Sequence, residues 1–265
     1  MKTRKLYFFM LIPLCILLTL ACSLGGLSGT EEDAQPIQAS IPTEAPDNPP
    51  LPSASPPTTA PQPSAVVPQS VPSAGLTGRY TYERLLPDGT IQNGSLRISE
   101  FGEGYEFEWN NSAGVALMSG NSVAVAAGDK CGVVLYEIKR NNTMDGIWMD
   151  GGGIQGTEEL EPNASGSSEN ISGSYVIDGY NPDSSRYGGT AGLTPLGSIY
   201  SMHWETGGGA SNYYGIAIPQ GKQLAVSYGG DHCTVYFVQI QPDGSLNSII
   251  GFNDGRVGRE TAVRK

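Results

Sequence analysis

An internal duplication constrains this 265-residue chain more than any other feature of its sequence. The first copy begins at Leu76-Thr-Gly-Arg-Tyr80 and the second at Ile171-Ser-Gly-Ser-Tyr175. Identical residues then recur in the same order, with two small insertions in the second copy: Gly78/Gly173, Tyr80/Tyr175, Gly94/Gly189, Tyr105/Tyr200, Trp109/Trp204, Cys131/Cys233 and Gly156/Gly258. Self-similarity of this kind predicts two copies of one structural unit.

The apolar pattern within each copy predicts β-strands. Tyr105, Phe107 and Trp109 alternate with two glutamates, which is the period of a strand with one apolar face. Turn sequences such as Pro87-Asp-Gly89 separate short runs of this kind. In the first copy we expect strands near 78–84, 93–99, 104–109, 114–118, 122–127, 131–139, 144–149 and 154–160.

This spacing predicts an all-β fold: two tandem homologous antiparallel β-meander modules, each a small barrel or sandwich of about eight short strands. Module 1 is assigned to residues 76–160, a linker to 161–170 and module 2 to 171–265. Within module 1, the run 131–138 is apolar on both faces, as is its counterpart in module 2. A strand exposed on one side would be polar there, so we expect this strand to be covered by its own core and by the other repeat.

The N-terminus has the features of an export signal. Lys2, Arg4 and Lys5 precede an apolar run that is too short for a comfortable membrane span, and the run ends at Leu18-Thr-Leu-Ala-Cys22. This resembles the lipobox of bacterial lipoproteins, which implies a signal peptide over 1–21 and lipidation of Cys22 with fatty acyl chains such as palmitate. Thr19 stands where a branched aliphatic residue is usual, so cleavage as an ordinary secreted protein is the alternative.

A low-complexity segment follows, and with Cys22 it makes up residues 22–75. It is rich in proline and almost without aromatic residues, so it cannot bury enough apolar surface to fold. We expect a disordered, extended linker that holds the modules away from the membrane.

Cys131 and Cys233 occupy equivalent positions in the two copies. An exported protein can keep disulfides, so an inter-repeat bridge is one interpretation and two separate buried thiols are the other. Since each copy contains one of these cysteines, a bridge within a copy is excluded.

Nothing in the sequence predicts a catalytic constellation. His232 precedes Cys233, but neighbours in a regular strand point to opposite faces, and His203 aligns with Glu108 on a polar face. The paired aspartates, Asp88/Asp183 and Asp129/Asp231, stand in turn sequences, three of them beside a glycine, as turn-capping residues do. We therefore expect no enzyme, no catalytic residue, no metal site and no cofactor.

Tyr213 and Tyr214 are candidate ligand contacts, because they lie in a glycine-rich loop over 205–214 that an insertion enlarges and that we expect to expose them. The alternative is that one of them caps the core. The formal net charge of −11 excludes nucleic acid as a natural partner. The order Gly-x-Tyr, Pro-Asp, Tyr-x-Gly, Trp and a Val/Tyr-rich strand resembles uncharacterised secreted bacterial proteins, and that resemblance implies no activity.

The sequence thus predicts an extracytoplasmic, lipid-anchored envelope protein, at the cell surface or in the periplasm, that presents two β modules with a binding or structural role. Its partner would be a protein, a glycan or a small apolar ligand. A small-ligand carrier of lipocalin-like type is the alternative, and an envelope hydrolase is less favoured. A barrel interior filled with Trp and Tyr would favour the first over the carrier, because it leaves no cavity.

Overall fold

The computed structural model describes residues 75–163 and 170–265. The signal peptide, Cys22 and all of the 22–75 linker but its last residue lie outside these ranges. Within them, no helix is long and apolar enough to span a membrane.

The described residues form sixteen β-strands and one 3-10 turn, η1 (Gly207–Gly209). The strands of the first copy agree with the predicted ranges to within a few residues: β1 (Gly78–Leu85), β2 (Ile91–Phe101), β3 (Gly104–Trp109), β4 (Ser112–Ser119), β5 (Ser122–Ala127), β6 (Gly132–Ile138), β7 (Met144–Met149) and β8 (Gln155–Pro162). The second copy contributes β9 (Gly173–Tyr180), β10 (Arg186–Leu196), β11 (Ile199–Thr206), β12 (Ser211–Gln220), β13 (Gln223–Tyr228), β14 (Thr234–Ile240), β15 (Leu246–Gly251) and β16 (Val257–Arg264).

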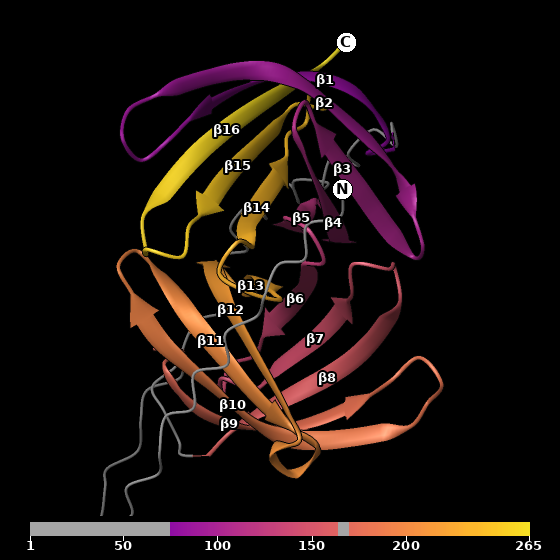
Figure 1. Cartoon of the computed structure of the whole chain (residues 1–265), viewed down its shortest axis with the longest axis vertical. Helices are drawn as coiled ribbons and strands as arrows, with labels where there is room; N and C mark the ends of the chain where they lie inside the picture. The colour runs from indigo at the N-terminus through magenta and orange to yellow at the C-terminus, as the bar shows by residue number, and fades with distance from the viewer. Residues whose placement is uncertain (1–74, 164–169) are drawn as a thin grey trace, which may run out of the picture. The chain divides into compact units, whose positions relative to one another are not determined.

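These strands close into two antiparallel barrels of eight strands each, which confirms the predicted fold class. Barrel 1 contains β1–β5 together with β14–β16, and barrel 2 contains β6–β13 (Figure 1). Every neighbouring pair is antiparallel, and closure leaves neither sheet with a free edge.

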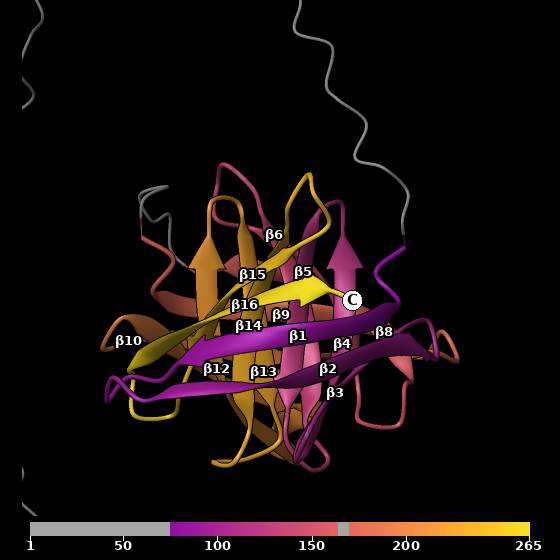
Figure 2. The ribbon, with the colours of Figure 1, turned by 90° about the horizontal axis from the view of Figure 1, so that it is seen from above.

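The barrels do not coincide with the sequence repeats, so the assignment of one module to 76–160 and another to 171–265 needs correction. Each barrel takes five consecutive strands from one repeat and three from the other. The pairing of β5 with β14 joins the repeats in barrel 1, and the pairing of β13 with β6 joins them in barrel 2. Figure 2 shows β1 beside β16, the other seam of barrel 1, where Tyr80 is aligned with Arg264.

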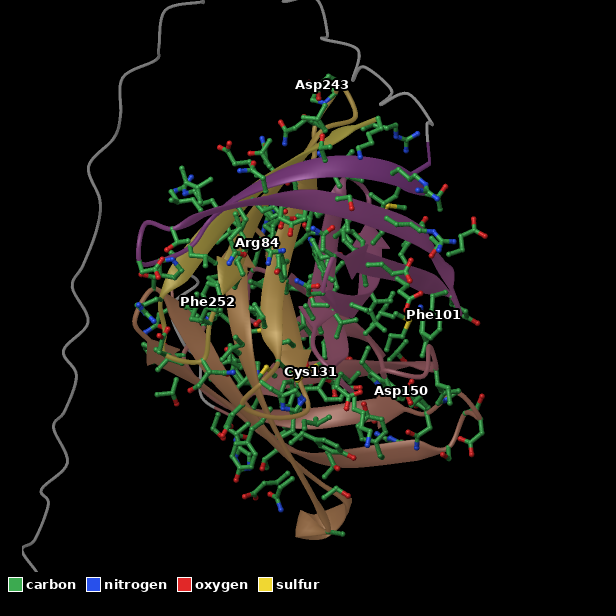
Figure 3. The ribbon with its side chains drawn as sticks, turned by 45° about the horizontal axis from the view of Figure 1, so that its top comes forward. Arg84, Phe101, Cys131, Asp150, Asp243 and Phe252 are labelled. Carbon is green, nitrogen blue, oxygen red and sulfur yellow. A yellow bond between two sulfur atoms is a disulfide. The ribbon has the colours of Figure 1, made fainter. Side chains whose placement is uncertain are left out.

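The chain crosses between the barrels twice, after β5 and after β13. A disulfide between Cys131 and Cys233 connects these two crossings, with the Cα atoms 5.7 Å apart. Of the two interpretations of these cysteines, the inter-repeat bridge is the one present in the structure. Figure 3 places Cys131 between the strands of the two barrels.

The strands next to the crossings are buried on both faces, as expected. In β6, Val134 and Tyr136 point into barrel 2, whereas Val133 and Leu135 join a separate cluster between the barrels. In β14, Tyr236 and its inward neighbours fill barrel 1 while the alternate side chains join the same cluster. The element that covers the outer face of β6 is therefore the other barrel, which itself contains strands of both repeats.

Small side chains let the barrels approach closely. Ala124 and Ala126 on β5 and Ala225 on β13 are fully buried in the cluster between the barrels. Face-to-face sheets normally pack about 10 Å apart, and alanines at the closest strands keep that spacing short. The two barrels are thus joined by the apolar cluster between them, in addition to the exchange of strands between the repeats.

Candidate ligand-binding site

A glutamate is buried inside each barrel at equivalent positions of the two repeats. Glu158 on β8 belongs to barrel 2 and Glu260 on β16 belongs to barrel 1, and their residues are only 7% and 4% exposed. Each accepts a hydrogen bond from the indole Nε1 of a tryptophan of the other repeat: Trp204 for Glu158 and Trp109 for Glu260. Because of the strand exchange, both interior sites are assembled from two repeats.

In barrel 1 the glutamate is neutralised by an internal cation. Arg84 on β1 places its Nε 2.8 Å and its Nη2 2.6 Å from the Oε2 of Glu260. The guanidinium also lies 5.0–5.5 Å from the ring centres of Tyr82, Trp109 and Tyr236. Burial raises the pKa of Glu260, and Arg84 and Trp109 oppose that rise. Figure 3 shows Arg84 among the strands of barrel 1.

In barrel 2, the groups of residues 75–163 and 170–265 that donate to the glutamate are all neutral. Tyr136 Oη donates to Oε1 of Glu158, Tyr187 Oη donates to Oε2 at 3.0 Å, and Trp204 Nε1 donates to Oε1 at 3.3 Å. Burial raises the pKa of Glu158, and these three hydrogen bonds oppose the rise. Burial and the Glu158 carboxylate together raise the pKa values of Tyr136 and Tyr187, which keeps both as donors.

Aromatic rings lie flat on the wall of barrel 2 because their cross-strand partners are glycines. A Cβ at any of these glycines would collide with the ring beside it. Glycine is favoured at such close approaches since it has no side chain. The ring and glycine pairs are Tyr136/Gly146, Trp148/Gly156, Tyr187/Gly179 and Tyr228/Gly132.

The rings border a pocket of about 510 Å³ at one end of barrel 2. Glu158 lines this pocket together with Asp150, which follows β7. The aromatic residues of the lining are Trp148, Tyr187, Trp204, Tyr213 and Tyr228. A concave, largely aromatic cavity with a few convergent polar groups is the usual form of a small-ligand site. We call it the barrel 2 pocket.

The repeat equivalences show how barrel 1 differs at the same place. Gly179 corresponds to Arg84, and Asp150 corresponds to Phe252, which packs against the core of barrel 1. Val134 corresponds to Tyr236, whose ring stacks on Trp109 with the centres 4.9 Å apart. Side chains of barrel 1 therefore occupy the space that the barrel 2 pocket leaves open.

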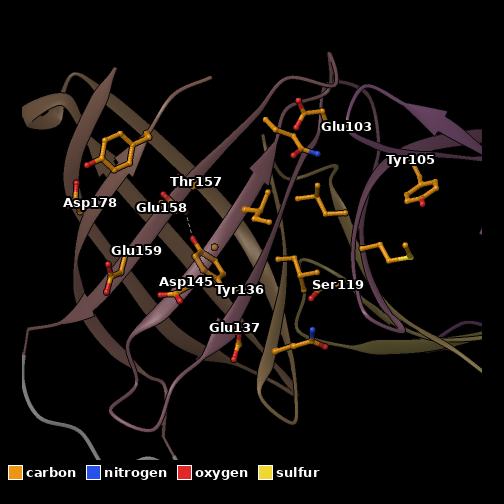
Figure 4. A pocket seen from close by; sticks show the side chains of 18 residues that line it. Glu103, Tyr105, Ser119, Tyr136, Glu137, Asp145, Thr157, Glu158, Glu159 and Asp178 are labelled. Atoms are coloured by element: carbon orange, nitrogen blue, oxygen red, sulfur yellow. Dashed lines mark hydrogen bonds between the residues drawn. The ribbon is translucent and has the colours of Figure 1, made fainter. Parts of the chain in front are cut away.

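A second hollow, of about 670 Å³, lies on the outer side of β6–β8 and extends to barrel 1. Figure 4 shows several of its acidic side chains, with the Tyr136–Glu158 hydrogen bond behind the strand. Lys139 lies 3.0 Å from Glu137 and 3.2 Å from Asp145, so these exposed acids are already partnered. This hollow is open and its chemistry is that of an ordinary charged surface.

The two candidate contact tyrosines diverge in the structure. Both lie in the first half of β12 rather than in a loop, so successive side chains alternate. Tyr213 lines the barrel 2 pocket and meets Tyr228 edge to face at 6.0 Å. Tyr214 is 61% exposed and stacks on His203 outside the pocket, with ring centres 4.5 Å apart.

His232 and Cys233 lie in the turn before β14 and not in a regular strand, so the expected opposition of their side chains does not apply. The His232 ring comes within 4.8 Å of the sulfurs of Cys131 and Cys233. Both sulfurs are in the disulfide, so this cluster offers neither a nucleophile nor a pair of thiolate ligands. The imidazole Nε2 lies 2.7 Å from the carbonyl oxygen of Asp129.

The turn aspartates behave as predicted for Asp88 and Asp183. The carboxylate of Asp88 accepts a hydrogen bond from the backbone N–H of Thr90, and that of Asp183 accepts one from the backbone N–H of Ser185. Asp243 and Asp254 make the same turn contact. These carboxylates stabilise hairpin turns.

The central residue of the pocket escaped the sequence interpretation. Glu158 lies in the expected strand 154–160 with acidic neighbours, Glu159 and Glu161, and nothing marked it as a site residue. The available signal was its equivalence to Glu260 in the last strand of the second copy. Comparisons of the chain with protein-family models, with curated proteins and with solved structures give no match.

Proposed function

We propose that this protein is an extracytoplasmic, lipid-anchored binding protein whose barrel 2 pocket takes a small ligand. Barrel 1, with its interior occupied, would support barrel 2 and complete it with a shared apolar face. The protein would act by binding and not by catalysis. The observation that carries the proposal is the difference between two homologous interiors, of which one is filled and the other is hollow.

The size and lining of the pocket favour a small molecule over a protein surface or an extended glycan. About 510 Å³ lies within the usual range for small-molecule sites, and five aromatic side chains supply rigid walls. The lining is not purely apolar, since Glu158 and Asp150 put polar groups at the same wall, and this favours a ligand with a polar group.

The anchor and the location are part of the proposal. They rest on the resemblance of Leu18-Thr-Leu-Ala-Cys22 to a lipobox and on the proline-rich segment behind it. Two or three acyl chains on Cys22 would hold the protein stably at a membrane, because each buried methylene contributes about 0.8 kcal/mol. The linker would keep the barrels accessible to a diffusing ligand.

The test is native mass spectrometry of the full chain, purified in mild detergent from an exporting bacterial host. We expect a mature mass that starts at Cys22 and carries acyl chains, and an added mass of a small molecule that disappears on denaturation. Incubation with a metabolite extract from the same host precedes a second spectrum, so that a ligand lost in purification is replaced.

The two parts of the proposal can fail separately. An unacylated mass starting at another residue would overturn the anchor and leave the ligand site untouched. A bare polypeptide before and after incubation would overturn the ligand site and return the barrels to a structural role.

A further inference from the structure

Barrel 1 shows what kind of group the shared barrel interior accepts. The guanidinium of Arg84 pairs with Glu260 and is surrounded by three aromatic rings, so it has both a counter-ion and a cation–π environment. Only 13% of its side chain is exposed. In barrel 1, the cation that pairs with the buried glutamate is therefore a side chain of the protein itself.

Barrel 2 retains the counter-ion and its tryptophan without the cation, and other aromatic rings line its pocket. Glu158 and Trp204 stand where Glu260 and Trp109 stand, but Gly179 replaces Arg84. Among the residues that the structure describes, the ion pairs of barrel 2 lie on its outer surface, as between Arg186 and Asp178. Three neutral donors contact the Glu158 oxygens but none balances the charge of a carboxylate, and the pocket gives a cation a route to it.

The walls of the pocket suit a positive charge. Trp204 and Tyr228 meet edge to face at 6.2 Å, and Tyr213 meets Tyr228 in the same way, so the rings form a corner rather than a stack. Rings arranged around a hollow present their electron-rich faces to its contents, as in sites for organic ammonium ions. Asp150 adds a second carboxylate on the pocket wall.

We propose that the barrel 2 pocket binds a small organic cation with a guanidinium or primary ammonium head, with Glu158 as its counter-ion and the surrounding aromatic rings as its walls. This rests on the proposed ligand-binding function and specifies the class of ligand. The bound head would approach Glu158 from the pocket beside Tyr187, whose hydroxyl donates to Oε2 of Glu158 as the Arg84 guanidinium does to Oε2 of Glu260.

The protonation of Glu158 sets the pH dependence of binding. Burial raises the pKa of the Glu158 carboxyl, so a cation that requires the carboxylate must displace its proton at low pH. The other titratable groups around it are Tyr136 on β6, Tyr187 on β10, Tyr228 on β13 and Asp150 after β7. The tyrosines stay neutral because burial raises their pKa values, so affinity should rise with pH as Glu158 ionises.

The experiment uses tryptophan fluorescence of the full chain, because two of its three tryptophans, Trp148 and Trp204, line the pocket. A Trp109→Phe background removes the third, which lies inside barrel 1. Ethylguanidinium and ethylammonium are titrated beside ethylurea, a neutral compound of similar shape. A capped arginine peptide presents the same head on a polypeptide.

Three variants separate the counter-ion from the fold. Glu158→Gln removes the charge with little change of shape, and Glu159→Gln is the matched control on the exposed face of the same strand. The pair Gly179→Arg with Tyr187→Gln reproduces Arg84 and Gln92 of barrel 1, which occupy the same register. Circular dichroism and the unfolding midpoint show whether each variant is folded.

We expect ethylguanidinium to bind about tenfold or more tightly than ethylurea, as a charge-assisted contact requires. Glu158→Gln should remove that preference, Glu159→Gln should keep it, and the Arg-bearing double variant should bind no cation. Equal binding of ethylurea, or full affinity in Glu158→Gln, would overturn the cation inference while leaving a ligand pocket. Binding of the peptide alone would overturn the small-molecule part. If no compound binds and the purified chain carries no ligand, the proposed function itself fails.

Discussion

The two barrels have the same tryptophan–glutamate contact in their interiors but balance the buried glutamate with different groups. Both place a tryptophan of one repeat against a glutamate of the other, and both surround that pair with aromatic rings. Barrel 1 balances the glutamate with Arg84 and fills its end, whereas barrel 2 uses neutral donors and leaves a pocket. The difference shows that a few inward-facing residues decide whether the interior of such a barrel is filled or contains a pocket.

The strand exchange makes this divergence possible. Each interior takes its glutamate from one repeat and its tryptophan from the other, so the common framework needs both copies in either barrel. The distinguishing residues come from single positions, such as Gly179 against Arg84. Substitutions in one copy can therefore open one barrel while the other stays packed.

The largest expected effect comes from removing the disulfide, which tests whether the barrels are a single unit. The double variant Cys131→Ser/Cys233→Ser should lose about 4–5 kcal/mol of unfolding free energy, because the bridge spans a sequence separation of 102 residues. Urea unfolding should still show one transition, since each barrel contains strands of both repeats and the two barrels share the apolar cluster between them. Two separated transitions would mean that each barrel unfolds independently, so that the two barrels are separate domains and not one folding unit.

Removing the internal cation of barrel 1 should have nearly as large an effect. Arg84→Met leaves Glu260 buried without its partner, and we expect a loss of about 3–5 kcal/mol in urea unfolding. Arg97→Met is the matched control, because its pair with Glu108 is exposed and should contribute less than about 1 kcal/mol. Adding Glu260→Gln to Arg84→Met should recover part of the loss. Equal effects of the two arginine variants would contradict the role assigned to Arg84.

The neutral donors of barrel 2 should differ in strength according to burial. Tyr136→Phe removes a donor from a fully buried position and should cost about 1.5–3 kcal/mol. Tyr187→Phe removes one from a half-buried position, and about 0.5–1.5 kcal/mol is expected. Thermal or urea unfolding of both variants measures the ranking. A larger loss of stability for Tyr187→Phe than for Tyr136→Phe would contradict the ranking of these two donors by burial.

The charge of Glu158 should be visible in the pH dependence of stability. The pKa of Glu158 is raised in the folded protein, so between its ordinary value and the raised one the folded state holds a proton that the unfolded chain has released. Stability relative to Glu158→Gln should therefore fall as the pH rises through that window, by at most about 1.4 kcal/mol per pH unit. Unfolding of both proteins from pH 4 to 8 tests this, with Glu159→Gln as control, and a flat difference would contradict it.

The smallest effect concerns the pocket wall. Tyr213→Ser gives barrel 2 the residue that barrel 1 has at the equivalent place, Ser112. Affinity for ethylguanidinium should fall about two- to fivefold with little change in stability, since the tyrosine is 44% exposed. Tyr214→Ser should leave the affinity unchanged, because that ring lies outside the pocket. An equal loss in both would move the site to the outer face.

Local pattern predicted the strands well because each short apolar run is bounded by its own turn residues, as at Pro87-Asp-Gly89. The exchange of strands was not predictable in this way. After β5 the chain either returns to its own sheet or crosses to another, and Gly128 with Cys131 is compatible with both routes. The two-sided burial of β6 was the one sign of a neighbour, and it did not identify which strands that neighbour contains.

The candidate site was predicted in part. Tyr213 lines the pocket, whereas Tyr214, named with equal weight, faces the other way because β12 begins earlier than the glycine-rich loop suggested, and contact of Tyr213 with a ligand stays a prediction. Glu158 was missed since acidic neighbours made it look solvent-exposed. Burial of a carboxylate depends on which strand lies opposite, and that information is absent from a local window.

The exchanged strands also describe how such a molecule could be built from one gene copy. Two separate chains, each the length of one repeat, would complete one another about a two-fold axis, with five strands of either closing on three of its mate. In that dimer, the last strand of each subunit pairs with the first strand of the other, as β8 pairs with β9 and β16 with β1. The present chain then corresponds to such a dimer in which a covalent connection joins β8, the last strand of one subunit, to β9, the first strand of the other. Joining two such subunits in one chain lets the two interiors differ in sequence, which no symmetric homodimer can do.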